Sequence, residues 1–363
     1  MHKNLYVSEN PYIMYKIIIK AFINKDEKRD LIIADNIDSM LPLADVLKEF
    51  KLFERIYIYR YNRLDKYHSM TVERGKNVFT SFLMFMKRYW SATFHQKDLK
   101  EDEQLKKVDF YVYNEIYTSD FDVSRINGYL AVNKIYYTLM EHAKYVFDKQ
   151  NIGLVYNLCT YIAYFLERIH LLTGIRIASQ YCRFVEVHEK KNLGKCMKLK
   201  KLKVWNIDQE IAKLSVEEKD SIYKIYAKAY QLDLDYSKKY NLLLTNPLAL
   251  DGVVESIEAQ KECYNKIYQE YLDDAYPLII KPHPRDTCLY DEVFPNAIIV
   301  NKDISSEIMN FSSKLKIQKA LTFYSTSVEA FKNQAKNIEF ISASEPEARQ
   351  SEFLIKFNKE WRK

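Results

Sequence analysis

The sequence predicts an α/β protein made of two domains, each with a parallel sheet. The chain has 363 residues, which is more than one hydrophobic core usually serves, so two domains are expected. Short β-branched segments alternate with helical ones along the chain, a pattern typical of parallel sheets with helices on both faces. Only six glycines and eight prolines are present, which argues against disorder and against a turn-rich all-β protein.

The first domain is expected over residues 1–205, where apolar β-branched runs indicate strands and Pro11 opens the first helix. The strands are expected at residues 4–7, 30–34, 55–59, 108–113, 134–139 and 183–187. The helices are expected at residues 11–22, 40–50, 72–93, 141–148 and 154–172.

The second domain is expected over residues 241–345, after a connection at 206–240 that carries a polar helix near 215–231. The strands are expected at residues 241–244, 278–281, 297–300, 320–323 and 337–341. The helices are expected over residues 254–271, from the Ser305–Ser306 pair onward, from Val328 onward, and over 345–361. We expect the terminal segment, 346–363, to cross back to the first domain.

A loop built around His283 follows the apolar run Leu278-Ile279-Ile280. That run predicts a buried parallel strand that delivers the loop at its carboxyl end. Pro282 and Pro284 hold the backbone on both sides of the histidine near extended values. Lys281 and Arg285 place positive charge on either side, which favours a phosphate ligand.

A second loop follows the apolar run at 320–323 and contains Tyr324, Ser325, Thr326 and Ser327. Serine and threonine between a strand and a helix cap the helix and direct hydroxyl and N–H groups toward an anion. In open α/β sheets, ligands bind beyond the carboxyl ends of the strands. Both loops are therefore candidates for one binding site.

Four short motifs carry a resemblance to a known family. Leu244-Thr245-Asn246-Pro247-Leu248, the Lys281–Asp286 stretch, Ser306-Glu307-Ile308 and Ser325-Thr326-Ser327 resemble, in that order, the C-terminal half of bacterial glycosyltransferase family 52. That family contains lipooligosaccharide and capsule sialyltransferases, and its His-Pro element is shared with bacterial polysialyltransferases. The resemblance is clear over about residues 240–345 and only general over the first 200.

The resemblance implies the GT-B architecture, in which two Rossmann-like domains face a central cleft. It also implies CMP-sialic acid as donor, a bacterial surface glycan as acceptor, inversion at the anomeric carbon, and no cofactor. In similar enzymes the position that matches Glu307 touches the nucleotide. The residues expected to bind the donor are Asn246, Lys281, Pro282, Arg285, Glu307, Tyr324, Ser325, Thr326 and Ser327.

The resemblance assigns the leaving phosphate to His283 and the acceptor proton to a base in an acidic-acidic-Gly element. Leu250-Asp251-Gly252 keeps one acid and the glycine, so Asp251 is the first candidate for the base. Glu141, at the end of a first-domain strand, is the second. Each of these residues also has a structural explanation. His283 and Asp251 could be turn residues, and Lys281 and Arg285 could be solvated surface cations. The Ser325–Ser327 run could cap a helix, and Glu307 could be an ordinary acid in a first helical turn.

We expect no metal site. Asp233-Leu234-Asp235 and Asp120-Phe121-Asp122 match the Asp-x-Asp metal motif of the other glycosyltransferase architecture, but this short pattern often occurs by chance. The cysteines show no CxxC spacing and indicate reduced thiols in a cytosolic protein. They are Cys159, Cys182, Cys196, Cys263 and Cys288.

The net charge of +6 is modest, and lysine is dense between residues 190 and 203. This cluster is expected to be a solvated face, with contact to anionic headgroups of the inner membrane as the weaker interpretation. No nucleic acid is expected as a partner, and a homodimer is left open. Two alternative functions also stay open: transfer from another nucleotide-activated donor, and a non-catalytic nucleotide-binding role in capsule assembly.

Overall fold

The computed structural model covers most of the chain. The residues that it describes are 3–35, 40–60, 79–80, 82–83, 86, 90, 93–119, 125–142, 146–148, 153–331, 335–342 and 344–361.

The chain divides into two compact units, Met1–Leu214 and Ser215–Lys363. Each contains one parallel sheet, which confirms the predicted α/β class with two Rossmann-like domains. The boundary falls inside the predicted connection, because helix α8 (Val216–Ala229) belongs to the second unit and buries Ile222 and Tyr226. Ser215 begins this helix with a capping box to Glu218.

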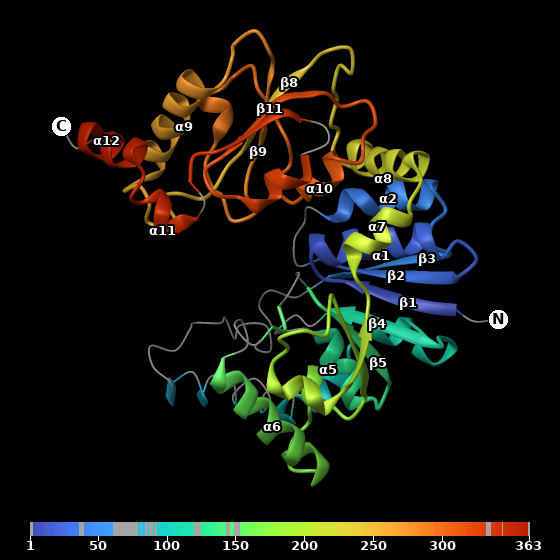
Figure 1. Cartoon of the computed structure of the whole chain (residues 1–363). Coiled ribbons are helices and arrows are strands. Elements are labelled where there is room, and N and C mark those ends of the chain that lie inside the picture. Colours follow the sequence, from blue (N-terminus) through green and yellow to red (C-terminus); the bar gives the residue numbers. More distant parts are fainter. Residues whose placement is uncertain are drawn as a thin grey trace. The chain divides into compact units, whose positions relative to one another are not determined.

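The first unit is built on a seven-stranded sheet of order β3-β2-β1-β4-β5-β6-β7 (Figure 1). This order extends the 3-2-1-4-5-6 arrangement of dinucleotide-binding folds by one strand. The strands are β1 (Lys3–Ser8), β2 (Lys28–Asp35), β3 (Arg55–Arg60), β4 (Glu115–Ser119), β5 (Tyr137–Met140), β6 (Cys182–Val187) and β7 (Lys201–Val204).

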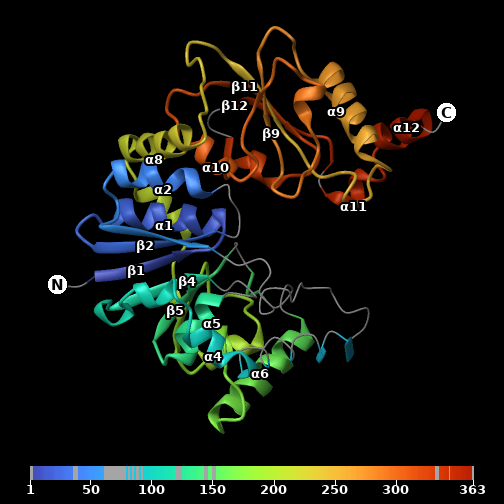
Figure 2. The same ribbon diagram turned by 180° about the vertical axis from the view of Figure 1, so that it is seen from behind.

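Helices cover both faces of this sheet. Figure 2 shows α1 and α2 on one side of the strands of this unit, and α4, α5 and α6 on the other side. The helices are α1 (Pro11–Ile23), α2 (Leu41–Glu49), α4 (Gln96–Lys100), α5 (Arg125–Val132), α6 (Leu154–Arg168) and α7 (Ile207–Lys213). Helix α1 starts as predicted, because Pro11 lies in its first turn and the Asn10 side chain accepts the Ile13 N–H at 2.8 Å.

Two predicted strands of the first unit are wrong in place. Residues 108–113 contain a 3₁₀ turn at Phe110–Val112 instead, because the Asp109 carboxylate accepts the Tyr111 N–H and starts a turn. The sheet uses β4, a few residues later. Strand β5 starts only at Tyr137, because Lys134 has a φ of 61° and ends the turn after α5.

Other first-unit predictions differ in smaller ways. Helix α5 and strand β7 were not predicted, while α6 confirms most of the helix expected at 154–172. Glu141 and His142 are not helical, and most of the helix expected at 72–93 lies outside the described residues.

The second unit has a five-stranded sheet of order β10-β9-β8-β11-β12. The chain therefore runs outward from β8 to β10, then crosses back to the other side of β8. The strands are β8 (Tyr240–Leu244), β9 (Leu278–Lys281), β10 (Ile298–Ile299), β11 (Ile317–Thr322) and β12 (Ala335–Phe340). All five lie close to the predicted positions.

The C-terminal helix packs within the second unit. Helix α12 (Glu352–Trp361) buries Leu354 and Phe357 in the same hydrophobic core as α9 (Ile257–Tyr271), and Lys266 pairs with Glu360 at 2.9 Å. Its buried side chains thus belong to the core of the second unit, and the expected crossing to the first domain stays a prediction. The remaining helices are α10 (Ser306–Met309) and α11 (Glu345–Ala348).

The five cysteines are all buried, and none is paired in a disulfide in the structure. Among the helices within the described residues, none is long and apolar enough to cross a membrane.

Candidate active site

Three loops of the second unit leave the same edge of its sheet. Strand register aligns Leu244 of β8 with Lys281 of β9 and with Thr322 of β11, and Figure 1 shows these strands in the upper unit. The residues that follow each strand therefore meet at one edge. The strand order reverses between β8 and β11, and ligands of open α/β sheets bind at such a reversal.

Asn246 lies at the centre of this edge and is buried. Its backbone N–H donates to the Tyr264 hydroxyl at 2.6 Å, and that hydroxyl donates back to the Asn246 carbonyl at 3.0 Å. Its side-chain oxygen accepts from Thr322 and from the Tyr324 N–H. Asn246 thus joins the ends of β8 and β11, the two strands that flank the reversal.

His283 lies in the loop after β9 and is partly exposed. Its Nδ1 accepts the backbone N–H of Arg285 at 3.1 Å. When neutral, the ring therefore carries its proton on Nε2, which is left as a donor. Burial, with Arg285 and Lys281 nearby, lowers the pKa of His283 below its usual value of 6.5. At neutral pH the side chain is an uncharged hydrogen-bond donor with a fixed tautomer.

A buried polar network beneath the loop holds the histidine in place, and sequence reasoning missed it. The Asp286 carboxylate accepts from Thr245 at 2.8 Å and from Tyr290 at 2.7 Å. It also accepts from the Gln260 amide and from the Cys288 N–H, both at 3.0 Å. The motif contained Asp286, but two of its partners, Thr245 and Gln260, are 41 and 26 residues away along the chain, so no local pattern indicated the network.

Thr245→Val tests this support. Thr245 donates to the Asp286 carboxylate and accepts the His283 N–H at 3.4 Å. The valine variant keeps the size of the side chain but leaves a buried carboxylate with one donor fewer. We expect the free energy of unfolding to fall by about 1.5–3 kcal/mol, the usual value for hydrogen bonds to charged groups. Chemical denaturation measures it, and an unchanged midpoint would remove Thr245 from the support of the loop.

Asp251 is bound by residues from two other loops. Its carboxylate lies 3.0 Å from the Arg285 guanidinium and accepts from the Tyr324 hydroxyl at 3.2 Å. The Asp251 side chain is only 11% exposed, whereas that of Arg285 is 58% exposed. Since the Arg285 N–H also binds His283, a single residue contacts both candidate catalytic side chains.

The turn that carries Asp251 requires its glycine. Gly252 has a φ of +66°, a conformation that favours glycine over other residues. Arg349 donates to the backbone carbonyls of both Asp251 and Gly252. The turn is therefore fixed from the C-terminal region of the unit, a contact that the sequence did not predict.

Lys281 has a buried ammonium that serves the loop itself. It donates to the Pro282 carbonyl at 2.6 Å and to the Lys302 carbonyl at 2.9 Å. Burial lowers its pKa to about 8, against the opposing effect of Asp303 and Glu307. A direct contact with a donor would require the ammonium to leave both carbonyls, so its first role is to position the loop. Pro282 is buried too.

Glu307 lies in the first turn of α10, beside the same loop. Its carboxylate accepts from the hydroxyls of Ser305 and Ser306. Ser305 is at the predicted N-cap position, but its hydroxyl serves this carboxylate rather than a backbone N–H.

The serine-rich loop leaves β11 next to Asn246. The Ser325 N–H donates to the Thr322 hydroxyl at 3.2 Å, and the Ser325 carbonyl accepts the Val328 N–H. A 3₁₀ helix, Thr326–Phe331, stands where an α-helix was expected. Ser325 and Ser327 are partly exposed, while the Thr326 side chain lies outside what the structure describes.

Glu141, the alternative base, is almost fully buried in the first unit. Its carboxylate accepts the backbone N–H groups of Phe147 and His188. These contacts give it a structural role at the end of β5.

No cluster of three possible metal-binding side chains is found within the described chain, which includes Asp233 and Asp235. Asp235 instead accepts from Ser237 and pairs with Lys238 at 3.5 Å. The other pair, 120–122, lies outside the described residues.

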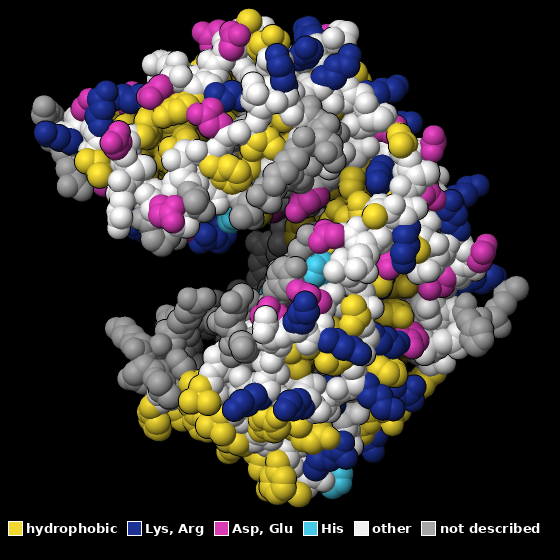
Figure 3. Space-filling view, in the orientation of Figure 1, with side chains coloured by type: hydrophobic (Ala, Val, Ile, Leu, Met, Phe, Trp, Pro, Cys, Tyr) yellow, Lys and Arg dark blue, Asp and Glu magenta, His cyan; other side chains and the backbone are white. Residues whose placement is uncertain are grey.

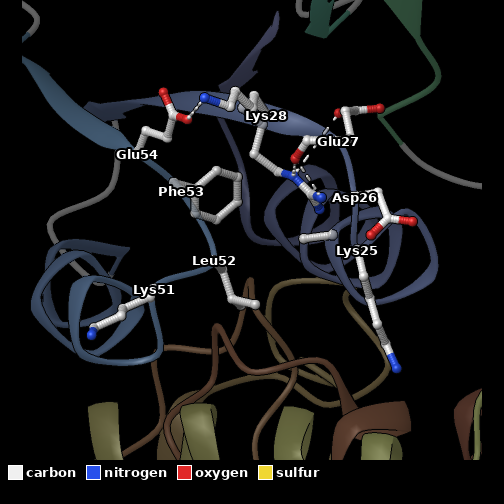
Figure 4. Close-up of a pocket in the computed structure, with 10 residues that line it drawn as sticks. Lys25, Asp26, Glu27, Lys28, Lys51, Leu52, Phe53 and Glu54 are labelled. Atoms are coloured by element: carbon white, nitrogen blue, oxygen red, sulfur yellow. Dashed lines mark hydrogen bonds and ion pairs between the residues drawn. The ribbon is translucent and has the colours of Figure 1, made fainter. Parts of the chain in front are cut away.

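A cavity of about 410 Å³ lies elsewhere in the first unit (Figure 4). It is lined by Ala21 and by residues 25–29 and 51–54, and it includes the Lys28–Glu54 pair at 3.5 Å. Most of these residues precede β2 and β3, and Lys28 and Arg29 begin β2, so the cavity lies at the amino ends of these strands. Ligands of parallel α/β sheets bind at the carboxyl ends of the strands. The second-unit site, which lies at such ends, is therefore the better candidate.

Together, these contacts bring three polar side chains of different kinds to one edge of the sheet. His283 offers an N–H donor, Arg285 an exposed cation, and Asp251 a carboxylate, all at the carboxyl edge of an open sheet. The fold is that of an open α/β protein, a class that binds ligands at such an edge of the sheet.

The family comparison agrees. The model of glycosyltransferase family 52 matches residues 54–344, which is most of the chain. The chain therefore belongs to glycosyltransferase family 52. The match begins well before the part in which the motifs were recognised, and it includes all of the candidate site residues.

A relative in Haemophilus influenzae is described as an uncharacterized protein. It is 29% identical over 153 residues, which are 42% of this chain and 47% of that protein. The match thus spans about half of the relative's length, and it suggests no activity.

Two solved structures show distant similarity to this chain. Spinosyn rhamnosyltransferase SpnG complexed with thymidine diphosphate has a TM-score of 0.49 at 6% identity, covering 100% of this chain and 91% of that one. The α/β-galactoside α-2,3-sialyltransferase from Photobacterium phosphoreum has a TM-score of 0.44 at 11% identity, covering 98% and 96%. Similarities of this size carry no argument about activity. The GT-B class is supported by the two parallel-sheet units themselves, and the predicted cleft stays a prediction.

Proposed function

We propose that this chain is an inverting, metal-independent sialyltransferase. It would transfer sialic acid from CMP-sialic acid to a terminal sugar of a bacterial surface glycan. The observation that carries the proposal is the contact of Arg285 with both His283 and Asp251, in a chain that belongs to family 52.

In the proposed reaction, Asp251 accepts the proton of an acceptor hydroxyl. The hydroxyl oxygen forms a bond to the anomeric carbon, and the bond from that carbon to the CMP phosphate oxygen breaks. The electron pair of that bond leaves with the phosphate. The Nε2–H of His283 and the Arg285 cation stabilise the negative charge that develops there.

A donor panel tests the substrate. Turnover with CMP-sialic acid, and none with UDP- or CDP-linked donors, is the expected result. Turnover with another donor would replace the sialyltransferase proposal by a different glycosyltransferase. Absence of any donor hydrolysis, together with CMP binding, would favour the non-catalytic alternative.

Activity is expected to persist in EDTA. The proposed charge relief at the phosphate comes from His283, Arg285 and the serine loop, so the mechanism assigns no step to a divalent ion. Initial rates with and without chelator measure this. Loss of activity that Mn²⁺ or Mg²⁺ restores would refute metal independence.

The serine loop is proposed to bind the donor phosphate. Replacing Ser325, Thr326 and Ser327 together by alanine should weaken CMP binding, by about 0.5–1.5 kcal/mol for each neutral hydrogen bond lost. Isothermal titration calorimetry with CMP measures the change. Ser313→Ala is the control, because the Ser313 hydroxyl donates to Asp220 at 2.6 Å rather than to a residue of this loop. Unchanged affinity in the triple variant would remove the loop from the phosphate site.

A further inference from the structure

Helix α6 exposes several of its large apolar side chains, while small side chains are prominent among those it buries. Cys159, Thr160 and Ala163 face the core, whereas Leu154 is 81% exposed and Phe165 is 62% exposed. A helix that only covered a sheet would have the reverse arrangement. We call the exposed set the α6 surface; it consists of Leu154, Leu158, Tyr161, Phe165 and Ile169.

The spacing of these residues makes the α6 surface continuous. They follow one another at intervals of four, three, four and four residues, so they lie along one face of the helix. Figure 3 shows hydrophobic side chains gathered in the lower part of the molecule, where Figure 1 shows α6. Contiguous exposed apolar surface of this kind marks an interaction site.

The neighbouring segment extends the apolar surface. Phe82 and Met86 pack against the core cluster that contains Cys159 and Ala163, which places this segment beside α6. Other side chains of the same segment are exposed and apolar. They are Phe79, Leu83, Trp90 and Phe94.

Positive charge borders the α6 surface. Lys195 and Lys198 are exposed in the turn after Gly194, and the Tyr161 hydroxyl donates to the Lys195 carbonyl at 2.9 Å. Arg168 is exposed at the end of α6. The one acid within α6, Glu167, is buried and accepts the Gly174 N–H at 3.2 Å, so the exposed face of this helix carries no negative charge.

We propose that the α6 surface docks onto an anionic lipid bilayer. An apolar face with aromatic side chains, bordered by lysine and arginine, is the pattern of a helix that lies in the membrane interface. The cations reach the headgroups while the apolar side chains enter the acyl boundary. A second copy of this chain fits less well, because a two-fold interface over this surface would bring lysines against lysines.

Vesicle sedimentation of the full chain tests the proposal. We expect binding to phosphatidylglycerol-rich vesicles, with binding to pure phosphatidylcholine weaker by about tenfold or more, and weakening as NaCl is raised. Leu158→Ser/Phe165→Ser should lower the partition coefficient by about tenfold or more, and Lys195→Glu/Lys198→Glu should remove the preference for anionic lipid. The matched control is Leu289→Ser/Ile355→Ser, with side chains 58% and 57% exposed in the second unit.

Circular dichroism confirms that each variant is folded, and transfer to a water-soluble acceptor should stay unchanged in all of them. Equal vesicle binding by wild type and Leu158→Ser/Phe165→Ser, or no binding to anionic vesicles, would overturn the proposal. So would a wild-type dimer in light scattering that becomes monomeric in this variant, because the occupant of the α6 surface would then be a second copy.

Discussion

Replacing His283 with alanine is expected to lower kcat by about 10²–10⁴, the usual contribution of a positioned acid–base group. The reason is the loss of the Nε2–H donor, which the contact between Nδ1 and the Arg285 N–H fixes in the neutral ring. CMP affinity should change by only a few-fold, because the donor acts mainly on charge that develops as the phosphate leaves. Steady-state kinetics with CMP-sialic acid, together with calorimetry of CMP binding, separates the two effects.

Two conservative variants sharpen this prediction. Glutamine at position 283 can place an amide N–H near the Nε2 position, so His283→Gln should recover part of the lost rate. His283→Asn reaches only the Nδ1 position and should be as slow as alanine. Equal rates for all three variants would mean that the Nε2–H is not the functional group.

The pH dependence of kcat/KM follows from the lowered pKa of His283. The active form is the neutral ring, because protonation removes the Nδ1 acceptor of the Arg285 N–H. Since the pKa of His283 lies below 6.5, kcat/KM should not depend on this group above neutral pH. It should fall as the pH drops below the pKa of His283. An acidic limb that persists unchanged in His283→Gln would assign it to another group.

Much of the second unit could be predicted from its sequence. Runs such as Leu242-Leu243-Leu244 and Leu278-Ile279-Ile280 are fully buried in parallel strands, and such strands show continuous apolar sequence. The first unit was harder, because partly exposed strands lack that signal. Strand β7 has the sequence Lys-Leu-Lys-Val, which within a lysine-dense segment resembles a solvated linker.

The candidate site could be predicted in its motifs but not in its contacts. The sequence suggested His283 and Asp251 separately, from a proline-bracketed loop and from a glycine. Their common partner Arg285 was assigned only to the donor, because a side chain that binds 34 residues away leaves no local pattern. The burial of Lys281 could not be predicted from the sequence either, since a lysine that ends a strand is more often exposed than buried.

Asp251→Asn is the second change with a large expected effect, again about 10²–10⁴ in kcat. Asparagine keeps the size of the side chain and an oxygen that can accept from Tyr324 and Arg285, the two partners of the carboxylate. Its amide oxygen is far less basic than a carboxylate and cannot take the acceptor proton. The variant therefore isolates proton acceptance from the architecture of the turn. Glu141→Gln is the control, and it should leave kcat within a few-fold.

Azide distinguishes a lost base from a disrupted site. As an anion, azide attacks the anomeric carbon without giving up a proton, so it needs no general base. CMP still leaves with the electron pair of the broken bond, and this step still needs His283. We therefore expect azide to restore CMP release in Asp251→Asn, with a glycosyl azide as product, but not in His283→Ala. If Glu141→Gln were the inactive variant that azide rescues, the base would be in the first unit, and Asp251 would only position Arg285 and Tyr324.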